Sequence, residues 1–213
     1  MRDMFLRGGP LMWPLLLCSM VSLTISIERI TFWWKEKRRR DKNRLEKIFG
    51  RTESGDHSGV LHSIQGRKNE IDGLDFLARI LTSGLANREY GLRESMEVAA
   101  EDEIEGMKRG LDILDTIITM APLLGILGTV LGIIDSFDLL GHSGIEDPKA
   151  VTGGIAQALI TTAAGLTVAL MTLIPFNYLV AKVKKETKEI NKIIVRFEAA
   201  YRNGLEKKHQ HDN

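Results

Sequence analysis

Two stretches of sequence decide the class of fold: APLLGILGTVLGIID at residues 121–135 and GGIAQALITTAAGLTVALMTLIPFNY at residues 153–178. Both are long enough to enter a bilayer, and both carry Gly, Ala and Thr where lipid-facing helices usually carry Leu and Ile. Small residues let helix backbones approach closely, and hydroxyl groups make polar contacts where water is scarce. Neither stretch contains Lys, Arg, Glu or His, and Asp135 stands at the end of the first. The pattern predicts membrane helices that assemble tightly around a component that supplies the charge.

The 213 residues contain three uncharged runs, at 8–27, 116–134 and 150–181. A helix needs about 20 apolar residues to cross a hydrocarbon core that is roughly 30 Å thick. The first two runs fit this length with little to spare. The third has 32 residues and would reach about 48 Å at about 1.5 Å per residue, so it should project beyond the core. We therefore expect an all-α membrane protein with three transmembrane helices, in which spans two and three extend into long cytoplasmic helices.

Basic residues set the expected orientation. They cluster after span one and after span three, whereas the connection between spans two and three holds only Lys149. The two clusters comprise Lys35, Lys37, Arg38, Arg39, Arg40, Lys42 and Arg44, and Lys182, Lys184, Lys185, Lys188 and Lys192. The positive-inside rule then places the N-terminus outside and both basic segments in the cytoplasm.

A cleaved signal peptide is the alternative interpretation of the first run. That run ends at Glu28 and Arg29, followed by the aromatic residues of 32–34, without a small-residue cleavage site. Aromatic residues before a basic cluster are typical of an interfacial belt, so an uncleaved anchor is favoured. Cys18 is the only cysteine and lies within the span, which excludes an intrachain disulfide and leaves packing as its default role.

Between spans one and two the sequence is polar. Residues 34–49 suit a charged helix along the headgroups, and residues 50–66, rich in Gly and Ser, indicate a loop or a broken helix. His57 and His62 fall in this loop without further ligands at a spacing that suits a metal. We expect neither a metal site nor a cofactor there.

From Glu70 the apolar spacing is again helical, and no proline precedes Pro122, so this helix can continue into span two. Four glycines, at positions 84, 91, 106 and 110, weaken it by up to about 1 kcal/mol each. Its acidic face either meets the basic segments or is solvated, and the sequence leaves both open.

Motifs in the three spans follow one another in a specific order: GGPLMWPLLLCS at 8–19 with IER at 27–29, APLLGILGTVLGII at 121–134, and GIAQALITTAAGLTVA at 154–169 with PFNY at 175–178. Together they resemble the MotA/TolQ/ExbB proton-channel family. Within this family, they resemble the ExbB-like biopolymer transport proteins more than the other branches. A three-span chain with its N-terminus outside is also the ExbB/TolQ arrangement. A flagellar MotA-type stator would have four spans, which argues against that branch.

The resemblance implies a homopentamer in the bacterial inner membrane around a dimer of an ExbD/TolR-like single-span partner. That partner carries a membrane-embedded aspartate, and proton flow exerts force on a TonB-like protein for outer-membrane transport. Two alternatives stay open: a TolQ-like subunit for envelope integrity, and a pentameric scaffold that does not conduct. The sequence contains no Gly-rich phosphate loop, no nucleophile with a base and no metal-ligand cluster, so we predict neither an enzyme nor a nucleic-acid partner.

The expected segments follow in chain order: a periplasmic N-terminus at 1–9, transmembrane helix 1 at 10–34, a cytoplasmic helical domain at 35–112, transmembrane helix 2 at 113–138, a periplasmic loop at 139–152, transmembrane helix 3 at 153–180, and a cytoplasmic C-terminal helix and tail at 181–213.

Four polar residues of the spans are the candidate proton pathway: Thr129, Gln157, Thr161 and Thr162. A hydroxyl group can donate to a carboxylate and accept from a carboxylic acid, so a threonine can accompany the partner aspartate through protonation and release. An unpaired charge in the membrane costs at least about 2.5 kcal/mol on insertion scales. The alternative for Thr161 and Thr162 is that each hydroxyl bonds to a carbonyl one turn back.

Gln157 departs from the family pattern, in which GIAEAL is common where this chain has GIAQAL. No acid remains in the third span. We expect the partner aspartate to be the only titrating group and Gln157 to supply hydrogen bonds, whereas an obligatory glutamate at this position would make the chain a non-conducting scaffold.

The remaining candidates have structural roles or lie at the mouths of span two. Asp112 and Asp115, at its cytoplasmic end, either help protons to leave or pair with Arg29 and nearby lysines. Asp135, near the outer face, is favoured as a helix terminator over a proton entrance. We expect five residues to serve helix packing: Gly125, Gly128, Gly132, Gly165 and Pro122.

Overall fold

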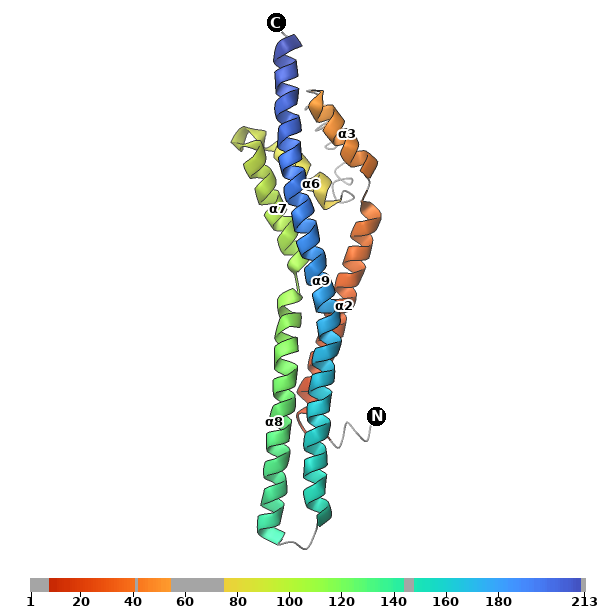
Figure 1. Ribbon diagram of the computed structural model, residues 1–213, viewed down its shortest axis with the longest axis vertical. Helices are drawn as coiled ribbons and strands as arrows, with labels where there is room; N and C mark the ends of the chain where they lie inside the picture. The colour runs from red at the N-terminus through yellow and green to blue at the C-terminus, as the bar shows by residue number, and fades with distance from the viewer. Residues whose placement is uncertain (1–7, 41, 55–74, 144–147, 212–213) are drawn as a thin grey trace. The chain divides into compact units, whose positions relative to one another are not determined.

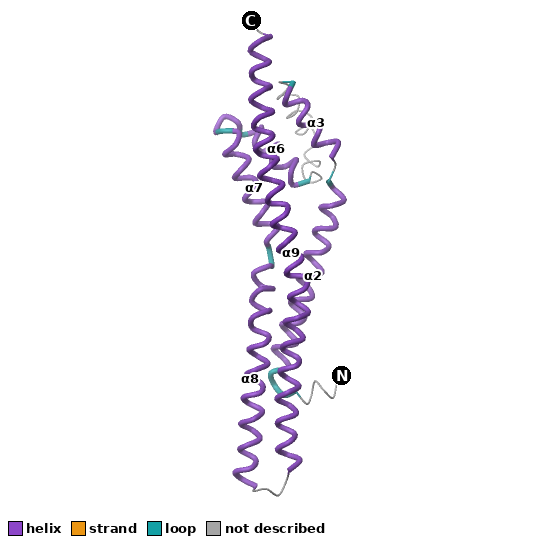
Figure 2. Tube along the Cα trace, viewed as in Figure 1, coloured by secondary structure: helices purple, strands orange, loops and turns teal. Residues whose placement is uncertain are grey.

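The computed structural model describes residues 8–40, 42–54, 75–143 and 148–211, which form helices and short turns, with no strand in that part of the chain (Figures 1 and 2). Three described helices are long and apolar enough to cross a membrane: α2 (Met12–Arg39), α8 (Leu111–Ser143) and α9 (Pro148–His211). The expected all-α architecture with three spans is confirmed.

The chain divides into two compact units, and α2 and α9 each contribute to both. The membrane unit comprises residues 1–29 and 110–180, and the polar unit comprises residues 30–109 and 181–213. Many large apolar side chains are exposed on the membrane unit, among them Leu17, Leu123 and Leu170, each more than 60% exposed. Such a surface is costly in water and suits contact with lipid.

Within the membrane unit, α8 and the first half of α9 run side by side in opposite directions (Figure 1). The first half of α2 is parallel to α9: Gly8, just before α2, contacts Thr161, and Ser22 further along contacts Thr172. A small core of Leu15, Ala121 and Ala169 joins one residue from each helix. Because two of these three are alanines, the three helices meet at short distance.

The polar unit contains α3 (Lys42–Glu53), α6 (Phe76–Ala86), the short 3-10 helix η1 (Arg88–Tyr90) and α7 (Leu92–Lys108), together with the ends of α2 and α9. The side chain of Asp75 caps α6 by accepting a hydrogen bond from the Ala78 amide at 2.9 Å. A cap of this kind stabilises a helix by about 1 kcal/mol. Leu81 and Leu85 of α6 and Met96 of α7 are fully buried in the polar unit.

The helix expected over residues 34–49 is interrupted. α2 continues to Arg39, and α3 begins at Lys42 and extends to Glu53, into the segment from Gly50 where we expected a loop or a broken helix. Thr52 is buried in this last turn, and its hydroxyl donates to the Ile48 carbonyl at 2.8 Å. The rest of the predicted loop, with His57 and His62, lies outside the described residues.

The helix expected from Glu70 into span two is also interrupted, twice. η1 separates α6 from α7, and a turn at Arg109 and Gly110 separates α7 from α8. Gly91 and Gly110 have φ angles of 104° and 80°. Glycine adopts this left-handed region without the penalty that a side chain would bring, so the chain can change direction at both points.

The helices that contain spans two and three continue beyond the predicted ends of these spans, toward their connection. α8 reaches Ser143 and α9 starts at Pro148, so the residues described between 139 and 152 are largely helical. Proline is tolerated in the first turn of a helix because the amide hydrogen that it lacks has no partner there. Residues 144–147 are outside the described part.

Candidate functional site

Glycines bring the backbones of α8 and α9 together. A Cβ atom on Gly125 would lie 3.1 Å from the Thr162 Cα, and one on Gly132 would lie 2.9 Å from the Gly154 carbonyl oxygen. One on Gly165 would collide with the Ala121 carbonyl oxygen. These neighbours are backbone atoms and cannot rotate away as a flexible side chain can.

The other two packing candidates have different surroundings. A Cβ on Gly128 would collide with the side chain of Thr161 rather than with backbone. Pro122 is half-buried inside α8, next to the Ala121 that joins the three-helix core. The backbones of α8 and α9 are therefore in contact at three glycines, and a fourth glycine, Gly128, leaves space for the side chain of Thr161.

The Thr162 hydroxyl donates to the Gly125 carbonyl of α8 at 2.8 Å, so it bridges spans two and three. The Thr129 hydroxyl instead donates to the Ile126 carbonyl in its own helix at 2.6 Å. Both side chains are half-buried. A hydroxyl oxygen has two acceptor lone pairs, so each can still accept from a protonated carboxyl, and each can donate to a carboxylate after rotation.

Thr161 is buried, with 1% of its surface exposed, at a junction of α8, α9 and the turn before α2. Its hydroxyl lies 2.6 Å from the Gly8 carbonyl oxygen and 2.9 Å from the Gln157 carbonyl oxygen. With one hydrogen to donate, it serves one of these carbonyls at a time. The alternative of a hydrogen bond to the carbonyl one turn back is therefore one of its two available contacts, and the contact with the Gly8 carbonyl is the other.

Gln157 is half-buried, and its carboxamide lies against Gly9. Thr161 and Gln157 are one turn apart on α9, so the structure brings these two candidates together beside the Gly8–Gly9 turn. Thr162 faces α8 at Gly125, a different contact. Thr129 bonds within α8, so Thr161 and Gln157 are the two of the four polar candidates that the described contacts bring together.

A further polar contact in the membrane unit was not predicted from the sequence. The hydroxyls of Ser22 and Thr172 lie 2.7 Å apart, and both side chains are buried. Thr172 also donates to the Val168 carbonyl at 2.8 Å when its hydrogen points along α9. The serines at positions 19, 22 and 26 of span one were the available signal, because a hydroxyl inside a span requires a partner.

The acidic candidates at the start of span two are exposed. Asp112 is in the first turn of α8 and Asp115 follows, where negative charge interacts favourably with the helix dipole. Arg29, one of their expected partners, is buried and binds the carboxylate of Glu28 through two N–H groups, at 2.5 and 2.8 Å. Asp135 is exposed within α8, which continues for two more turns beyond it, so the prediction that it terminates the helix is wrong.

Ion pairs connect the helices of the polar unit. Arg40 binds Glu189 and also lies 3.4 Å from a carboxylate oxygen of the buried Glu186, which accepts from Lys182 at 2.7 Å. The hydrogen bond from Arg40 holds the pKa of Glu189 below its ordinary value, although partial burial opposes this shift. The carboxylate of Glu36 accepts from the Phe76 amide at 2.9 Å, at the start of α6.

The acidic face of α7 is partly paired. Glu103 accepts two hydrogen bonds from Arg79 of α6, at 2.6 and 2.7 Å. Hydrogen bonding to Glu103 raises the pKa of Arg79. Glu97 pairs with Arg93 in its own helix. Both partners lie outside the basic clusters that the sequence analysis considered.

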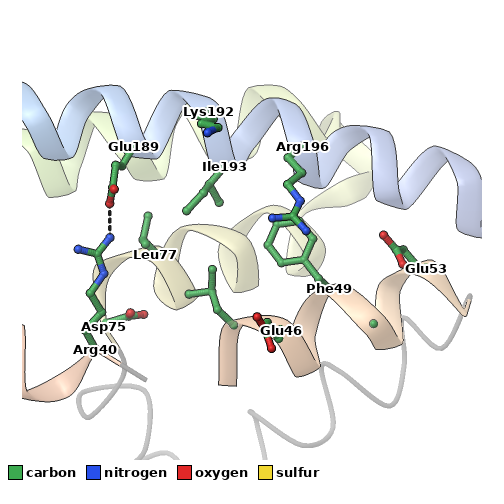
Figure 3. Close-up of a pocket in the computed structure, with 12 residues that line it drawn as sticks. Arg40, Glu46, Phe49, Glu53, Asp75, Leu77, Glu189, Lys192, Ile193 and Arg196 are labelled. Carbon is green, nitrogen blue, oxygen red and sulfur yellow. Dashed lines mark hydrogen bonds and ion pairs between the residues drawn. The ribbon is translucent and has the colours of Figure 1, made fainter. Parts of the chain in front are cut away.

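A groove of about 580 Å³ lies in the polar unit between α3, the start of α6 and α9 (Figure 3). Leu77 and Ile193 point into it, and the Arg196 guanidinium stands 4.9 Å from the ring centroid of Phe49. Its lining holds three cations and four carboxylates, so charge alone selects no ligand: Arg40, Lys192 and Arg196, and Glu46, Glu53, Asp75 and Glu189. Among the described residues no cluster of His, Cys, Asp and Glu could hold a metal.

Three apolar helices and a polar helical unit define a multi-pass, all-α membrane protein. Residues 73–192 match the model of the MotA/TolQ/ExbB proton channel family. The chain belongs to this family, and the resemblance seen in its motifs is confirmed.

Curated relatives carry names from two branches. Biopolymer transport protein ExbB-like 1 of Synechocystis sp. is 36% identical over 222 aligned positions, covering 98% of this chain and 82% of the relative. The biopolymer transport protein ExbB homolog of Methanothermobacter thermautotrophicus is 30% identical, covering 90% of this chain and 67% of the relative. The Tol-Pal system protein TolQ of Haemophilus influenzae is 32% identical, and the alignment covers 50% of this chain and 47% of the relative.

Proposed function

We propose that this chain is the channel and stator subunit of a proton-driven complex in the bacterial inner membrane. In this proposal five copies surround a dimer of an ExbD/TolR-like single-span partner, and the complex energises a TonB-like protein for outer-membrane transport. The N-terminus is periplasmic, and residues 35–112 and 181–213 are cytoplasmic. The coverage of the ExbB-like relative along almost the whole chain favours this branch.

One observation carries the proposal: a member of a proton channel family has no Asp, Glu, His, Lys or Arg in residues 8–27, 116–134 and 150–181, the apolar runs of its three spans. Hydroxyls and amides cannot store a proton at accessible pH, so the titrating group has to come from a partner. A carboxylate in the membrane needs polar neighbours that bond to it, because a bare charge costs at least about 2.5 kcal/mol there.

Thr162 and Thr129 are the residues that we propose as hydrogen-bonding neighbours of the partner carboxylate. Each hydroxyl can switch from its present carbonyl acceptor to the partner carboxylate, and can accept a hydrogen bond once that carboxylate is protonated. One charge that crosses 100 mV yields about 2.3 kcal/mol, so mechanical work on a TonB-like protein requires several protons. Asp112 and Asp115, exposed at the start of α8, are the proposed cytoplasmic exit.

The test is proton flux in liposomes that hold this protein with its ExbD/TolR-like partner. Wild type is compared with Thr129→Ala, Thr162→Ala and the matched control Thr162→Ser, which keeps the hydroxyl. Flux that falls in both alanine variants and persists in the serine variant supports the pathway. Flux that is the same in all four proteins would remove the threonines from it.

The non-conducting scaffold is a second candidate because Gln157 stands where the family commonly has a glutamate. A correctly assembled pentamer with its partner that shows no flux at any membrane potential would favour the scaffold. A TolQ-like role shares the proposed chemistry and differs in its client, and binding to a TonB-like or a Pal-like protein distinguishes the two.

A further inference from the structure

The turn at Gly8 and Gly9, immediately before α2, lies against the polar stretch of span three. The Gly8 carbonyl oxygen is 2.6 Å from the Thr161 hydroxyl, across 153 positions of sequence. A Cβ atom on Gly9 would collide with Nε2 of Gln157 and would stand 2.9 Å from its Cδ. Two neighbouring glycines thus contact two polar residues that are one turn apart on α9.

Gly9 meets two independent requirements that glycine alone satisfies easily. Its φ angle is 75°, in the left-handed region where a Cβ atom is strained. The space where its side chain would stand is also occupied, by the carboxamide of Gln157. Gly8 differs, because a Cβ there would meet mainly the flexible side chain of Met12.

The contact constrains a side chain that would otherwise be mobile. Glutamine has several rotatable bonds, and a half-buried glutamine can sample more than one rotamer. Gly9 limits that choice on one side. One turn further along α9, the Thr161 hydroxyl lies within hydrogen-bond distance of the backbone carbonyls of Gly8 and Gln157, so the Gly8–Gly9 turn contacts the side chains of both polar residues.

We propose that Gly9 is a positioning residue of the conduction pathway: it packs against Gln157 and fixes the direction in which this side chain presents its carboxamide. This inference rests on the proposed proton-channel function. It adds the N-terminal turn to the elements that set conduction, although the turn itself carries no group that exchanges protons.

The experiment uses the full chain with its ExbD/TolR-like partner in liposomes. Proton flux is measured for wild type, Gly9→Ala, Gln157→Ala and the double variant, with Gly153→Ala as the matched control. A Cβ on Gly153 would meet nothing within 4 Å, so this control adds the same methyl group to the membrane unit without a clash. Recovery of the partner with each variant verifies that the complex has assembled.

We expect Gly9→Ala to reduce flux about tenfold, the factor that corresponds to about 1.4 kcal/mol. The control should conduct as wild type does. Because Gly9 acts through Gln157, the double variant should conduct no less than Gln157→Ala alone. If the turn served folding only, the two losses would multiply in the double variant, and that result would overturn the positioning role.

A spectroscopic measurement tests the contact separately from flux. The chain has three glutamines, Gln65, Gln157 and Gln210, so the side-chain ¹⁵N signal of Gln157 is assigned by its loss in Gln157→Ala. Solid-state NMR should then detect transfer from a glycine Cα to this nitrogen in wild type, and a shifted signal in Gly9→Ala. A wild type that conducts without the contact overturns the inference and leaves the proposed function intact. A wild type that shows the contact and never conducts overturns both.

Discussion

Replacement of Gly165 by alanine tests how closely spans two and three approach. A Cβ at this position would collide with the Ala121 carbonyl oxygen and would lie 3.1 Å from the Gly125 Cα and 3.2 Å from the Gly125 nitrogen. All three neighbours are backbone atoms of α8, so the methyl group fits only if the two helices move apart.

The expected magnitude has two parts of opposite sign. Alanine favours a helix over glycine by about 1 kcal/mol, which stabilises the variant. Overpacking of a tight contact costs about 1–3 kcal/mol. Gly153→Ala, at a helical position with nothing within 4 Å, keeps the first part and lacks the second. The difference between the two variants is therefore the overpacking cost itself, about 1–3 kcal/mol.

The assay is unfolding of the full chain in mixed micelles, followed by circular dichroism as the fraction of denaturing detergent rises. We expect Gly153→Ala to unfold at the same point as wild type or later, and Gly165→Ala to unfold earlier than Gly153→Ala. Equal midpoints for the two variants would mean that the backbones of α8 and α9 are not in contact at Gly165, and the described geometry of the membrane unit would be refuted.

Three further predictions concern polar contacts. Thr162→Ala should lose about 1 kcal/mol of stability with its interhelical hydrogen bond, and Thr162→Ser should retain it in the same unfolding assay. A double-mutant cycle on Ser22 and Thr172, both changed to alanine, should give a coupling of about 0.6 kcal/mol, as other membrane hydrogen bonds do, and zero coupling would contradict the contact. The lowered pKa of Glu189 means that its pair with Arg40 stabilises the fold above the ordinary value of 4.5 and that this contribution is lost as the pH falls through the lowered pKa. Glu189→Gln should thus be less stable than wild type at neutral pH, by about 1 kcal/mol or less because the pair is partly exposed, and the two unfolding midpoints should converge in acid.

The sequence was sufficient to predict the three spans because length and the absence of charge are local properties. Runs 8–27, 116–134 and 150–181 each lie within one described long helix or begin just before it. The physical reason is strong: without water, backbone groups in a membrane must bond within the helix.

The interruptions of the polar helices were harder to predict. Gly84, Gly91, Gly106 and Gly110 are equivalent in a propensity scale, yet the chain turns with positive φ only at Gly91 and Gly110 among these four. Gly84 lies within α6, and Met96 packs against it. Gly106 stays in α7 with nothing within 4 Å of the position of a Cβ, so helix propensity does not distinguish the glycines that become turns from those that stay helical.

The candidate site was predictable as a set of residues but not as an arrangement. Thr161 and Thr162 are adjacent in sequence, and rotation by one residue sends the first toward the Gly8 turn and the second toward Gly125. The contact of Gln157 with Gly9 joins positions that are far apart along the chain. The GGP sequence at residues 8–10 signals a turn, and nothing local to it identifies the helix that it meets.

Proton flux through the complex reconstituted with the proposed ExbD/TolR-like partner is measured before and after the membrane aspartate proposed for that partner is changed to asparagine. If the titrating group comes from the partner, wild-type complex conducts and the asparagine complex, equally assembled, does not. Flux that survives this change would show that protons pass without the partner carboxylate, and the titrating group would have to be sought elsewhere.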